Sequence, residues 1–413
     1  MRIWLINHYA VPIKYYPLAR TTNFAKYLGR MGHEVIIFAA SSVHNNASVN
    51  LAHKNELYHR EFVDGIDYVL VRCCSYEGNG KDRIWNMFEF PRRLKKVCSH
   101  FKRPDVVMAS SATPLACMMG LRIAKKNGAK AVAEITDLWP ESFVAYGLLG
   151  KRNLLLPFMY TYEKRMYEYA DMIIFSMEGA ADYIRDRHWE KDVPKTKIAH
   201  INNGIDLEAF NYNRENFKLQ DDDLENNEII KVVYVGSIRK VNQLGYLLDI
   251  AKEIKNSRVK FLVWGTGDEF VKLQKRIEAE NVSNFVLKGR VDKQYIPYII
   301  SQADINIVHN SNAPIFRYGI SANKLFDNLA AGKPILVDFE SRYNPVAQGK
   351  AGLVVGGSQI DEVARTMEEF FTMPRETYEE YCKNAVITAK QYDFAVLTEK
   401  LADIFEEITH LHG

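Results

Sequence analysis

The sequence has few of the features that mark a secreted, metal-binding or membrane-spanning protein. It holds five cysteines in 413 residues, an odd number, and none forms a C-x-x-C pair, so neither a disulfide framework nor a structural zinc site is expected. No apolar run reaches the roughly 18 residues that span a bilayer. Met1 and Arg2 lead directly into the apolar run Ile3 to Ile6, without a signal-peptide pattern. We therefore expect a cytoplasmic protein without a bound metal.

The net charge is also low, at +3, but it is unevenly divided. Residues 1–200 hold 29 Lys and Arg against 20 Asp and Glu, and residues 201–413 hold 25 against 31. The excess is therefore +9 in the first half and −6 in the second. This asymmetry indicates that the first half meets an anionic partner, and lipid headgroups, a phosphorylated acceptor and nucleic acid all fit at this point.

What the sequence does contain is material for two domains. With 47% hydrophobic residues, the chain can form two cores of ordinary size. Strand, helix and strand patterns follow one another from Ile3 to Ala39, and the same alternation restarts at Ile229. The expected fold class is therefore α/β, with two doubly wound, Rossmann-like domains. We place the first domain at residues 1–205, the second at 206–390, and a C-terminal helix at 391–413 that packs back on the first domain.

Polar residues follow the strands of the first domain at places where such sheets bind ligands. His8 and Arg20 belong to the segment after the first strand, and Asp137 follows the strand Ala131 to Ile135. Open α/β sheets bind ligands at the carboxyl ends of their strands. The three residues are therefore candidates for ligand binding, although a structural role for the lone His8 is the alternative.

Residues 81–103 combine cations with aromatic side chains. Apolar residues recur at helical spacing after Pro91, which predicts a helix there, and six Lys and Arg lie between positions 92 and 103. An aromatic-rich stretch precedes them. This combination suits an anionic membrane surface, at roughly 1 kcal/mol per cation; the alternative is the solvated face of a helix that covers the sheet. Nucleic acid is not an expected partner, because no nucleic-acid-binding module accompanies the charge. The membrane candidates are Arg92, Arg93, Lys95 and Lys96.

The stretch from Ser321 to Pro334 predicts a helix with two different faces. Ser321 is the expected N-cap, and Gly332 with Pro334 ends the helix. One face is apolar, whereas Asp327 lies on the other. A helix start offers free backbone N–H groups to a diphosphate, and a carboxylate one turn further can accept hydrogen bonds from the two hydroxyls of a ribose. The alternative is an ordinary amphipathic helix with a solvated Asp.

Two loops of the second half carry glycines directly after predicted strands. The segment Gly236 to Lys240 places a flexible glycine and two cations at a strand end. The turn Gly265 to Gly267 begins a G-x-G-x-x-G pattern, but Phe270 replaces its third glycine, so a dehydrogenase is not expected. The acidic run Asp221 to Asp223 falls in a polar stretch, 211–228, that we interpret as a linker without a metal site.

Together, these segments resemble a GT-B glycosyltransferase of family 4, of the type that builds bacterial capsule, O-antigen or exopolysaccharide. The resemblance follows the family's order over nearly the whole chain, and it implies two Rossmann-like domains that face each other across a cleft. The motifs that carry it are GHEVIIF at 32–38, PDVVMAS at 104–110, EITDLWPES at 134–142, INNGIDLEAF at 201–210, YVGSIRK at 234–240 and SANKLFDNLAAGKPIL at 321–336.

The resemblance also implies a role for each candidate residue. Asp327 would hold the ribose, and Arg239 and Lys240 would stabilise the leaving diphosphate, while Asp137 would face the acceptor and the reacting sugar carbon. The other expected donor contacts are Gly236, Ser237, Gly289, Arg290, Val291, Ser321, Asn323, Lys324 and Leu325, of which Gly289 to Val291 would read the base. The expected acceptor contacts are His8, Arg20 and Glu141.

The function that this resemblance implies is a retaining, metal-independent hexosyltransferase without a cofactor. Its donor would be a nucleotide-diphosphate-sugar, with UDP as the expected nucleotide, and its acceptor a lipid-diphosphate-linked saccharide at the inner face of the membrane. One departure concerns the sugar, because Gly319 stands where the family has an acid eight residues before Asp327. The alternatives are a nucleotide-sugar epimerase on the same fold and a non-catalytic nucleotide-sugar-binding assembly protein. No oligomeric state is predicted.

Overall fold

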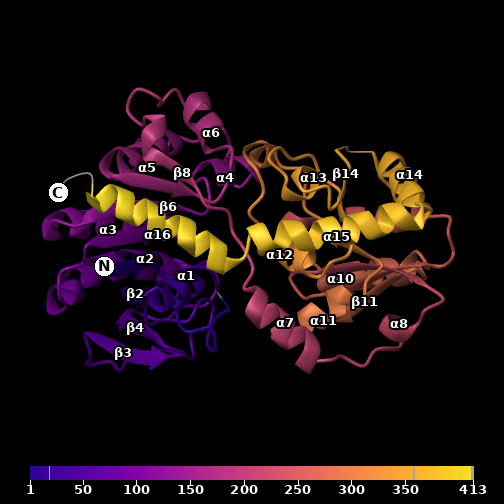
Figure 1. Cartoon of the computed structure of the whole chain (residues 1–413), viewed down its shortest axis with the longest axis horizontal. Coiled ribbons are helices and arrows are strands. Elements are labelled where there is room, and N and C mark those ends of the chain that lie inside the picture. The colour runs from indigo at the N-terminus through magenta and orange to yellow at the C-terminus, as the bar shows by residue number, and fades with distance from the viewer. Residues whose placement is uncertain (18, 357–358, 411–413) are drawn as a thin grey trace. The chain divides into compact units, whose positions relative to one another are not determined.

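The computed structural model describes residues 1–17, 19–356 and 359–410. Its internal contacts divide the chain into two compact units. The first contains Met1–Asn202 together with the C-terminal segment from Phe394, and the second contains Asn203–Asp393 (Figure 1). The last three residues of the predicted segment 391–413 lie outside the described residues.

The first unit is built on an eight-stranded sheet with the order β3-β4-β2-β1-β5-β6-β7-β8. All neighbouring pairs are parallel except β3 with β4. The strands are β1 (Arg2–Ile6), β2 (Glu34–Ala40), β3 (Tyr58–Val63), β4 (Ile66–Val71), β5 (Val106–Ser110), β6 (Lys130–Ile135), β7 (Met172–Phe175) and β8 (Ile198–His200). The helices are α1 (Ala19–Arg30), α2 (Lys81–Val97), α3 (Pro114–Asn127), α4 (Glu141–Ala145), α5 (Leu156–Tyr169), α6 (Ala180–Asp186) and α16 (Phe394–His410).

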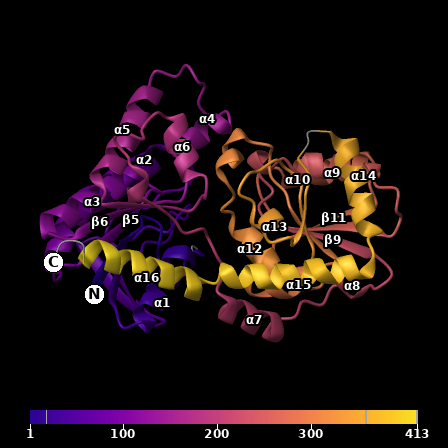
Figure 2. The same cartoon turned by 45° about the horizontal axis from the view of Figure 1, so that its top comes forward.

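The C-terminal helix α16 completes one face of the first unit. Its side chains Phe394, Leu397, Leu401 and Phe405 are buried in the same apolar cluster as Phe24 of α1. The rings of Phe24 and Phe394 meet edge to face, with centroids 5.5 Å apart. Figure 2 shows α16 lying beside α1. The first unit is therefore assembled from both ends of the chain.

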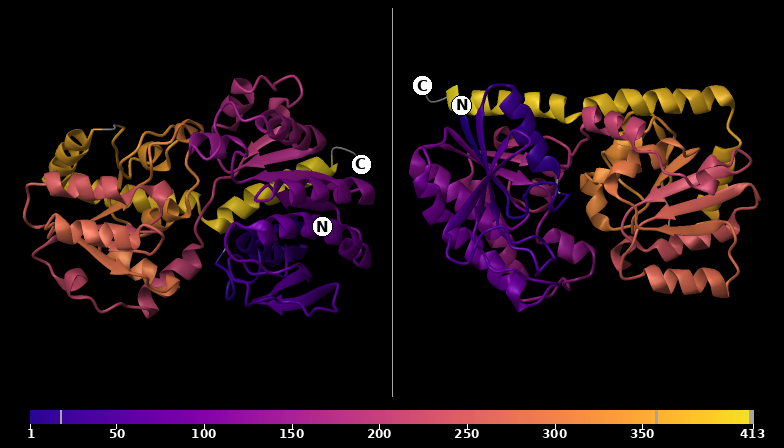
Figure 3. Two further views of the ribbon diagram at one scale, coloured as in Figure 1. Left: turned by 180° about the vertical axis from the view of Figure 1, so that it is seen from behind. Right: turned by 90° about the horizontal axis from the view of Figure 1, so that it is seen from below.

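The second unit has a six-stranded, fully parallel sheet with the order β11-β10-β9-β12-β13-β14. Helices cover both faces of it (Figure 3). The strands are β9 (Ile230–Val235), β10 (Val259–Trp264), β11 (Phe285–Gly289), β12 (Ile305–Val308), β13 (Ile335–Val337) and β14 (Gly352–Val354). The helices are α7 (Leu207–Asn216), α8 (Asp222–Glu225), α9 (Leu244–Glu253), α10 (Phe270–Ala279), α11 (Ile296–Ser301), α12 (Asn323–Ala330), α13 (Pro345–Gln348), α14 (Ile360–Phe371) and α15 (Arg375–Gln391).

The strand order confirms the predicted doubly wound α/β class, and it locates the ligand-binding edge of the second unit. From β9 the chain first adds β10 and β11 on one side and then β12, β13 and β14 on the other. The switch point thus falls between β9 and β12, which is where sheets of this class bind their ligands. No helix in the described parts of the chain is long and apolar enough to cross a bilayer.

Two segments differ from their sequence interpretation. The helix is not limited to the residues after Pro91 where the apolar spacing was noted, because α2 starts at Lys81 and runs through that proline, which is buried with Phe90 and Leu94 against the core. Packing of the apolar stripe thus outweighs the missing backbone donor. The stretch 211–228 is not a linker either, since it contains the end of α7 and the short helix α8. Asp221 caps α8, and Lys288 pairs with both Asp221 and Asp223 at 2.8 and 2.7 Å.

Candidate active site

The loop Gly236–Gln243 connects β9 to α9 at the switch point of the second unit. Hydrogen bonds inside the loop connect its two ends. The Asn242 side-chain amide donates to the backbone carbonyl of Ser237 and, at 2.9 Å, to the Ser237 hydroxyl. Arg239 and Lys240 lie at the tip of the loop with exposed side chains. Neither is paired with a carboxylate of the described residues. Two cations are thus presented on a folded loop without an internal counter-charge.

The glycines of the neighbouring turn support this loop. The Ile238 N–H donates to the carbonyl of Thr266 at 3.0 Å, so the two segments touch through their backbones. A Cβ on Gly265 would come within 1.8 Å of the Gly236 carbonyl oxygen, and one on Gly267 within 2.1 Å of the Ile238 carbonyl oxygen. Close backbone packing therefore explains why glycine occupies both positions. The G-x-G pattern needs no dinucleotide as an explanation.

Helix α12 carries the predicted diphosphate-binding residues, but it begins later than predicted. Ala322, not Ser321, is its N-cap residue, and no described side chain caps it. Ser321 lies one position too early to cap, and its backbone carbonyl accepts a hydrogen bond from the Asn203 side-chain amide at 3.3 Å. The same amide contacts the Asn323 side chain. The Leu325 N–H donates to the Ala322 carbonyl at 3.0 Å, whereas no described residue accepts from the N–H groups of Asn323 and Lys324, which are open to a ligand.

Two charged side chains of α12 lie in surroundings that shift their pKa values. Partial burial raises the pKa of Asp327 to about 6, with the charge of Lys293 opposing the rise. Burial lowers the pKa of Lys324 to about 8, and Asp338 opposes that shift. The ammonium of Lys324 donates to the carbonyl oxygen of His309 at 2.6 Å. Leu325, by contrast, is fully buried and packs in the core.

The segment predicted to read the base begins at Gly289, the last residue of β11. Gly289 has φ +76°, and its carbonyl accepts from the Gly265 N–H at 2.8 Å, which places it beside the glycine turn described above. Arg290 is exposed and Val291 half-buried. All the residues predicted for the donor therefore belong to the second unit, and they follow strands β9, β11 and β12, whose carboxyl ends share one edge of the sheet.

In the first unit, Asp137 lies in the loop after β6 with an exposed side chain. The backbone of that loop is anchored by Ser176, whose hydroxyl donates to the Thr136 carbonyl at 3.2 Å. Glu141 lies in the first turn of α4 and accepts a hydrogen bond from the Tyr160 hydroxyl at 2.6 Å. Asp137 is thus accessible at the carboxyl edge of the sheet, whereas Glu141 is already engaged.

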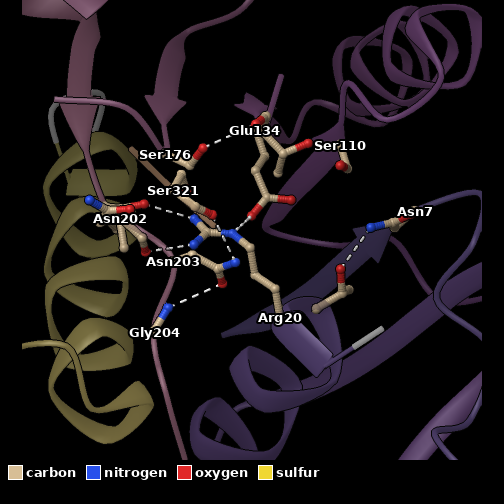
Figure 4. A network of polar contacts seen from close by, with 12 residues as sticks. Asn7, Arg20, Ser110, Glu134, Ser176, Asn202, Asn203, Gly204 and Ser321 are labelled. Atoms are coloured by element: carbon tan, nitrogen blue, oxygen red, sulfur yellow. Dashed lines mark hydrogen bonds and ion pairs between the residues drawn. The ribbon is translucent and has the colours of Figure 1, made fainter. Parts of the chain in front are cut away.

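Arg20 and Glu134 form a buried ion pair that ties three elements together (Figure 4). The Arg20 Nε atom is 2.8 Å from Glu134, and its other two nitrogens donate to the carbonyl oxygens of Ile201 and Asn202 at 2.9 and 2.6 Å. Both side chains are almost fully buried. Because all three nitrogens are used inside the unit, the structure favours a positioning role for Arg20 over direct contact with an acceptor.

His8 is buried at the end of β1, where its Nε2 atom meets the Asn86 side-chain oxygen at 2.5 Å. Burial lowers the pKa of His8 to about 4, so the ring is neutral near pH 7. Asn86 of α2 also donates to the Ser42 hydroxyl at 2.9 Å. His8 and Asn86 therefore attach α2 to the carboxyl edge of the sheet, which favours the structural alternative for His8.

Sequence reasoning missed Asn86, Asn203, His309 and Asp338. His309 and Asp338 each come directly after a buried strand, β12 and β13, and the position after an apolar run was the signal that could have identified them. Asn203 belongs to the motif INNGIDLEAF but was not singled out as a candidate. The described residues contain no group of three or more His, Cys, Asp or Glu side chains that could hold a metal ion.

Comparison with known families agrees with this geometry. Residues 19–209 match the family described as Glycosyltransferase Family 4, and residues 216–388 match the family described as Glycosyl transferases group 1. Each match falls largely within one of the two compact units. Both family matches follow the order expected from the motifs.

One curated relative and several solved structures are similar to this chain. The processive diacylglycerol alpha-glucosyltransferase of Acholeplasma laidlawii is 28% identical over 157 residues, which is 37% of this chain and 45% of that protein. Sucrose-phosphate synthase from Thermosynechococcus elongatus matches with a TM-score of 0.72, 14% identity and 99% coverage of both chains. Anabaena HepE in complex with UDP matches with a TM-score of 0.65 and 13% identity over 98% of this chain and 100% of that chain. The fold is therefore GT-B, as predicted.

Proposed function

We propose that the protein transfers a sugar from a nucleotide-diphosphate-sugar, with UDP as the nucleotide, to a lipid-diphosphate-linked saccharide. The observation that carries the proposal is the edge of the second unit, where the uncapped start of α12 and the cations Arg239 and Lys240 follow neighbouring strands. Breaking the sugar–phosphate bond develops negative charge on the diphosphate. Fixed N–H groups and cations stabilise that charge most strongly in the transition state.

Asp327 supports the nucleoside part of this donor. It lies one turn inside α12, where its carboxylate can accept hydrogen bonds from a ribose. The charge developed on the leaving diphosphate would be met by Arg239, Lys240 and the helix start, so the proposed reaction requires no metal. We further propose that the transfer retains the configuration at the anomeric carbon, and that Asp137 of the first unit contacts the acceptor.

The relatives support a UDP donor and a lipid-type acceptor. Anabaena HepE is described as a complex with UDP and with UDP-glucose, and the Acholeplasma relative is named for transfer of glucose to a diacylglycerol. A role in building bacterial surface polysaccharide agrees with the motif pattern of the whole chain. The identity of the sugar is left open by Gly319, which lacks the carboxylate expected at that position.

We also propose that α2 docks on an anionic membrane. Trp85, Phe88, Arg92 and Lys95 recur at spacings of three and four residues and so share one face of the helix. Trp85 and Phe88 are 59% and 55% exposed. They line a surface hollow of about 600 Å³ together with Arg92. Exposed aromatic rings beside cations suit the boundary between headgroups and acyl chains.

The proposal is tested by measuring thermal unfolding with UDP, GDP or NAD in the presence of a chelator. A ligand at 100 times its Kd stabilises the folded protein by about 2.7 kcal/mol. We expect UDP to stabilise the protein and NAD to have no effect. No response to either diphosphate would contradict the assignment of the α12 edge as a donor site.

Turnover then separates the proposed transferase from its alternatives. Incubation with a panel of UDP-sugars and a lipid-diphosphate-linked saccharide should give a longer saccharide, and the donor should be consumed only when the acceptor is present. Conversion of the donor without an acceptor would indicate an epimerase. Binding without turnover on any acceptor would indicate an assembly protein that binds nucleotide sugars.

A further inference from the structure

His309 and Asp338 form a buried polar pair at the carboxyl edge of the second unit. Strands β12 and β13 are paired in register up to Val308 and Val337, so the residues that follow them come side by side. The His309 Nδ1 atom is 2.5 Å from the Asp338 Oδ2 atom, and the two side chains are 1% and 0% exposed. Burying such a pair costs desolvation energy, so apolar packing does not account for it.

The other nitrogen of the His309 ring points to the loop Gly236–Gln243. Its Nε2 atom is 3.3 Å from the carbonyl oxygen of Gln243. Because a carbonyl oxygen can only accept, Nε2 must be the donor in this contact. The Asp338 carboxylate on the opposite side can also only accept, so Nδ1 donates to it and both ring nitrogens carry a proton in this arrangement. The two acceptors together fix the orientation of the ring.

Gln243 is the residue at which the loop enters α9, and its backbone is in an unfavourable conformation. It has φ +51° and ψ +43°, in the left-handed region. For a residue with a Cβ, this region is sterically unfavourable. A hydrogen bond from a buried side chain to the Gln243 carbonyl offsets part of this cost and fixes where the loop ends.

His309 also contacts the other segment of the proposed donor site. Its backbone carbonyl accepts the hydrogen bond from Lys324 of α12 described above. Its ring lies parallel to Tyr246, with 12° between the planes, and edge-on to Tyr234. The loop with Arg239 and Lys240 and the helix α12 are therefore both connected to one buried residue.

From these contacts we propose that His309 is a positioning residue, which fixes the loop Gly236–Gln243 through Gln243 and thereby places Arg239 and Lys240 for the diphosphate. Asp338 acts on the loop only through the ring of His309. The catalytic consequence rests on the proposed function, whereas the placement of the loop can be measured in the free protein.

The first test is hydrogen exchange of the free, full-length protein. His309→Phe keeps a ring against Tyr246 but removes both nitrogens, and we expect amides in residues 236–246 to exchange at least about 10-fold faster, with β10 and α15 unchanged. Asp338→Leu should have the same effect if His309→Phe does not fold. Asp338→Asn is the matched control, because its amide can donate to Nδ1 and leave the proton on Nε2, so protection should be kept. Unchanged exchange in residues 236–246, or an equal increase throughout the second unit, would overturn the proposal.

The second test is a double-mutant cycle on sugar transfer. We expect His309→Phe to lower kcat about 10-fold with an unchanged KM for the acceptor, and Arg239→Ala to lower it about 100-fold. If His309 acts through the loop, its loss should cost less in the Arg239→Ala background, where only Lys240 is left to be placed, so the double variant should be clearly less than about 10-fold slower than Arg239→Ala alone. A roughly 1,000-fold loss, the product of the single effects, would refute positioning through Arg239. Absence of transfer by the unmodified protein would reject the proposed function, while the exchange test would still decide the placement of the loop.

Discussion

Asp327 is a carboxylate whose surroundings make it sensitive to both a ligand and pH. Its pKa is raised to about 6 by partial burial, so ionisation costs free energy in the empty site. A ribose that donates two hydrogen bonds to the carboxylate would favour the ionised form. The residue is therefore the most direct test of whether α12 binds a nucleoside.

We expect Asp327→Ala to weaken UDP binding about 10- to 100-fold, because a hydrogen bond to a charged group contributes roughly 1.5–3 kcal/mol. Isothermal titration calorimetry measures the Kd. In the unmodified protein, the affinity should rise as the pH rises towards the pKa of Asp327, near 6, and level off above it. An alanine variant that binds UDP as tightly as the unmodified protein would show that Asp327 faces no ligand.

Asp137 of the first unit allows a prediction about sugar transfer, as Asp327 does about nucleotide binding. Its exposed carboxylate follows β6, in a part of the chain that carries none of the proposed donor contacts. We expect Asp137→Ala to leave the Kd for UDP unchanged and to lower the transfer rate at least about 100-fold, as for the loss of a group that acts on the reacting atoms. Nucleotide binding and transfer are measured on the same preparation. Normal turnover by this variant would remove Asp137 from the proposed mechanism.

Among the elements, α2 has two faces of different composition. Its buried side holds Asn86 and the apolar stripe against the core, and its other side presents the aromatic and cationic residues of the proposed membrane surface. Sequence periodicity identified the apolar and basic residues, but only over the part of the helix that follows Pro91. The stripe begins before the proline, and only packing against the sheet shows that the helix continues through it.

We expect neutralisation of Arg92, Arg93, Lys95 and Lys96 to reduce sedimentation with anionic liposomes, by roughly 1 kcal/mol per cation that faces the surface. Arg93 should contribute less than the others, because Glu89 pairs with it at 2.7 Å. The matched control is neutralisation of Lys272 and Lys275, two exposed cations of α10 in the second unit. Equal sedimentation of both variants and the unmodified protein would rule out α2 as the docking surface.

At the scale of the whole molecule, the repeat of strand, helix and turn signals was enough to predict two doubly wound units. The hairpin of β3 and β4 was missed although Asp64 and Gly65, with φ +51° and +79°, form the Asp-Gly turn typical of hairpins.

The pairing of His309 with Asp338 could not be predicted, because it depends on which strands are neighbours and in what register. Local patterns indicate where a strand ends, but only the assembled sheet shows which strand ends meet.

The pH dependence of stability should reflect one buried acid of the first unit. Glu163 of α5 accepts hydrogen bonds from the hydroxyls of Tyr167 and Tyr183 at 2.6 and 2.7 Å. Burial nevertheless raises its pKa from 4.5 to about 8. Between these two values the folded protein binds a proton that the unfolded chain has lost, so the free energy of unfolding falls as the pH rises.

We expect the loss of the Glu163 proton to lower the free energy of unfolding by roughly 1 kcal/mol per pH unit between pH 5 and 8. Glu163→Gln should remove it, because the amide can accept from one tyrosine and donate to the other without carrying a charge. Urea unfolding of both proteins across this range gives the two slopes, and Glu168→Gln, on the exposed side of the same helix, controls for the substitution. Since the variant no longer depends on a bound proton, its free energy of unfolding should increase relative to that of the unmodified protein as the pH rises. If the two free energies changed in parallel with pH, Glu163 would carry the same charge in the folded and the unfolded chain.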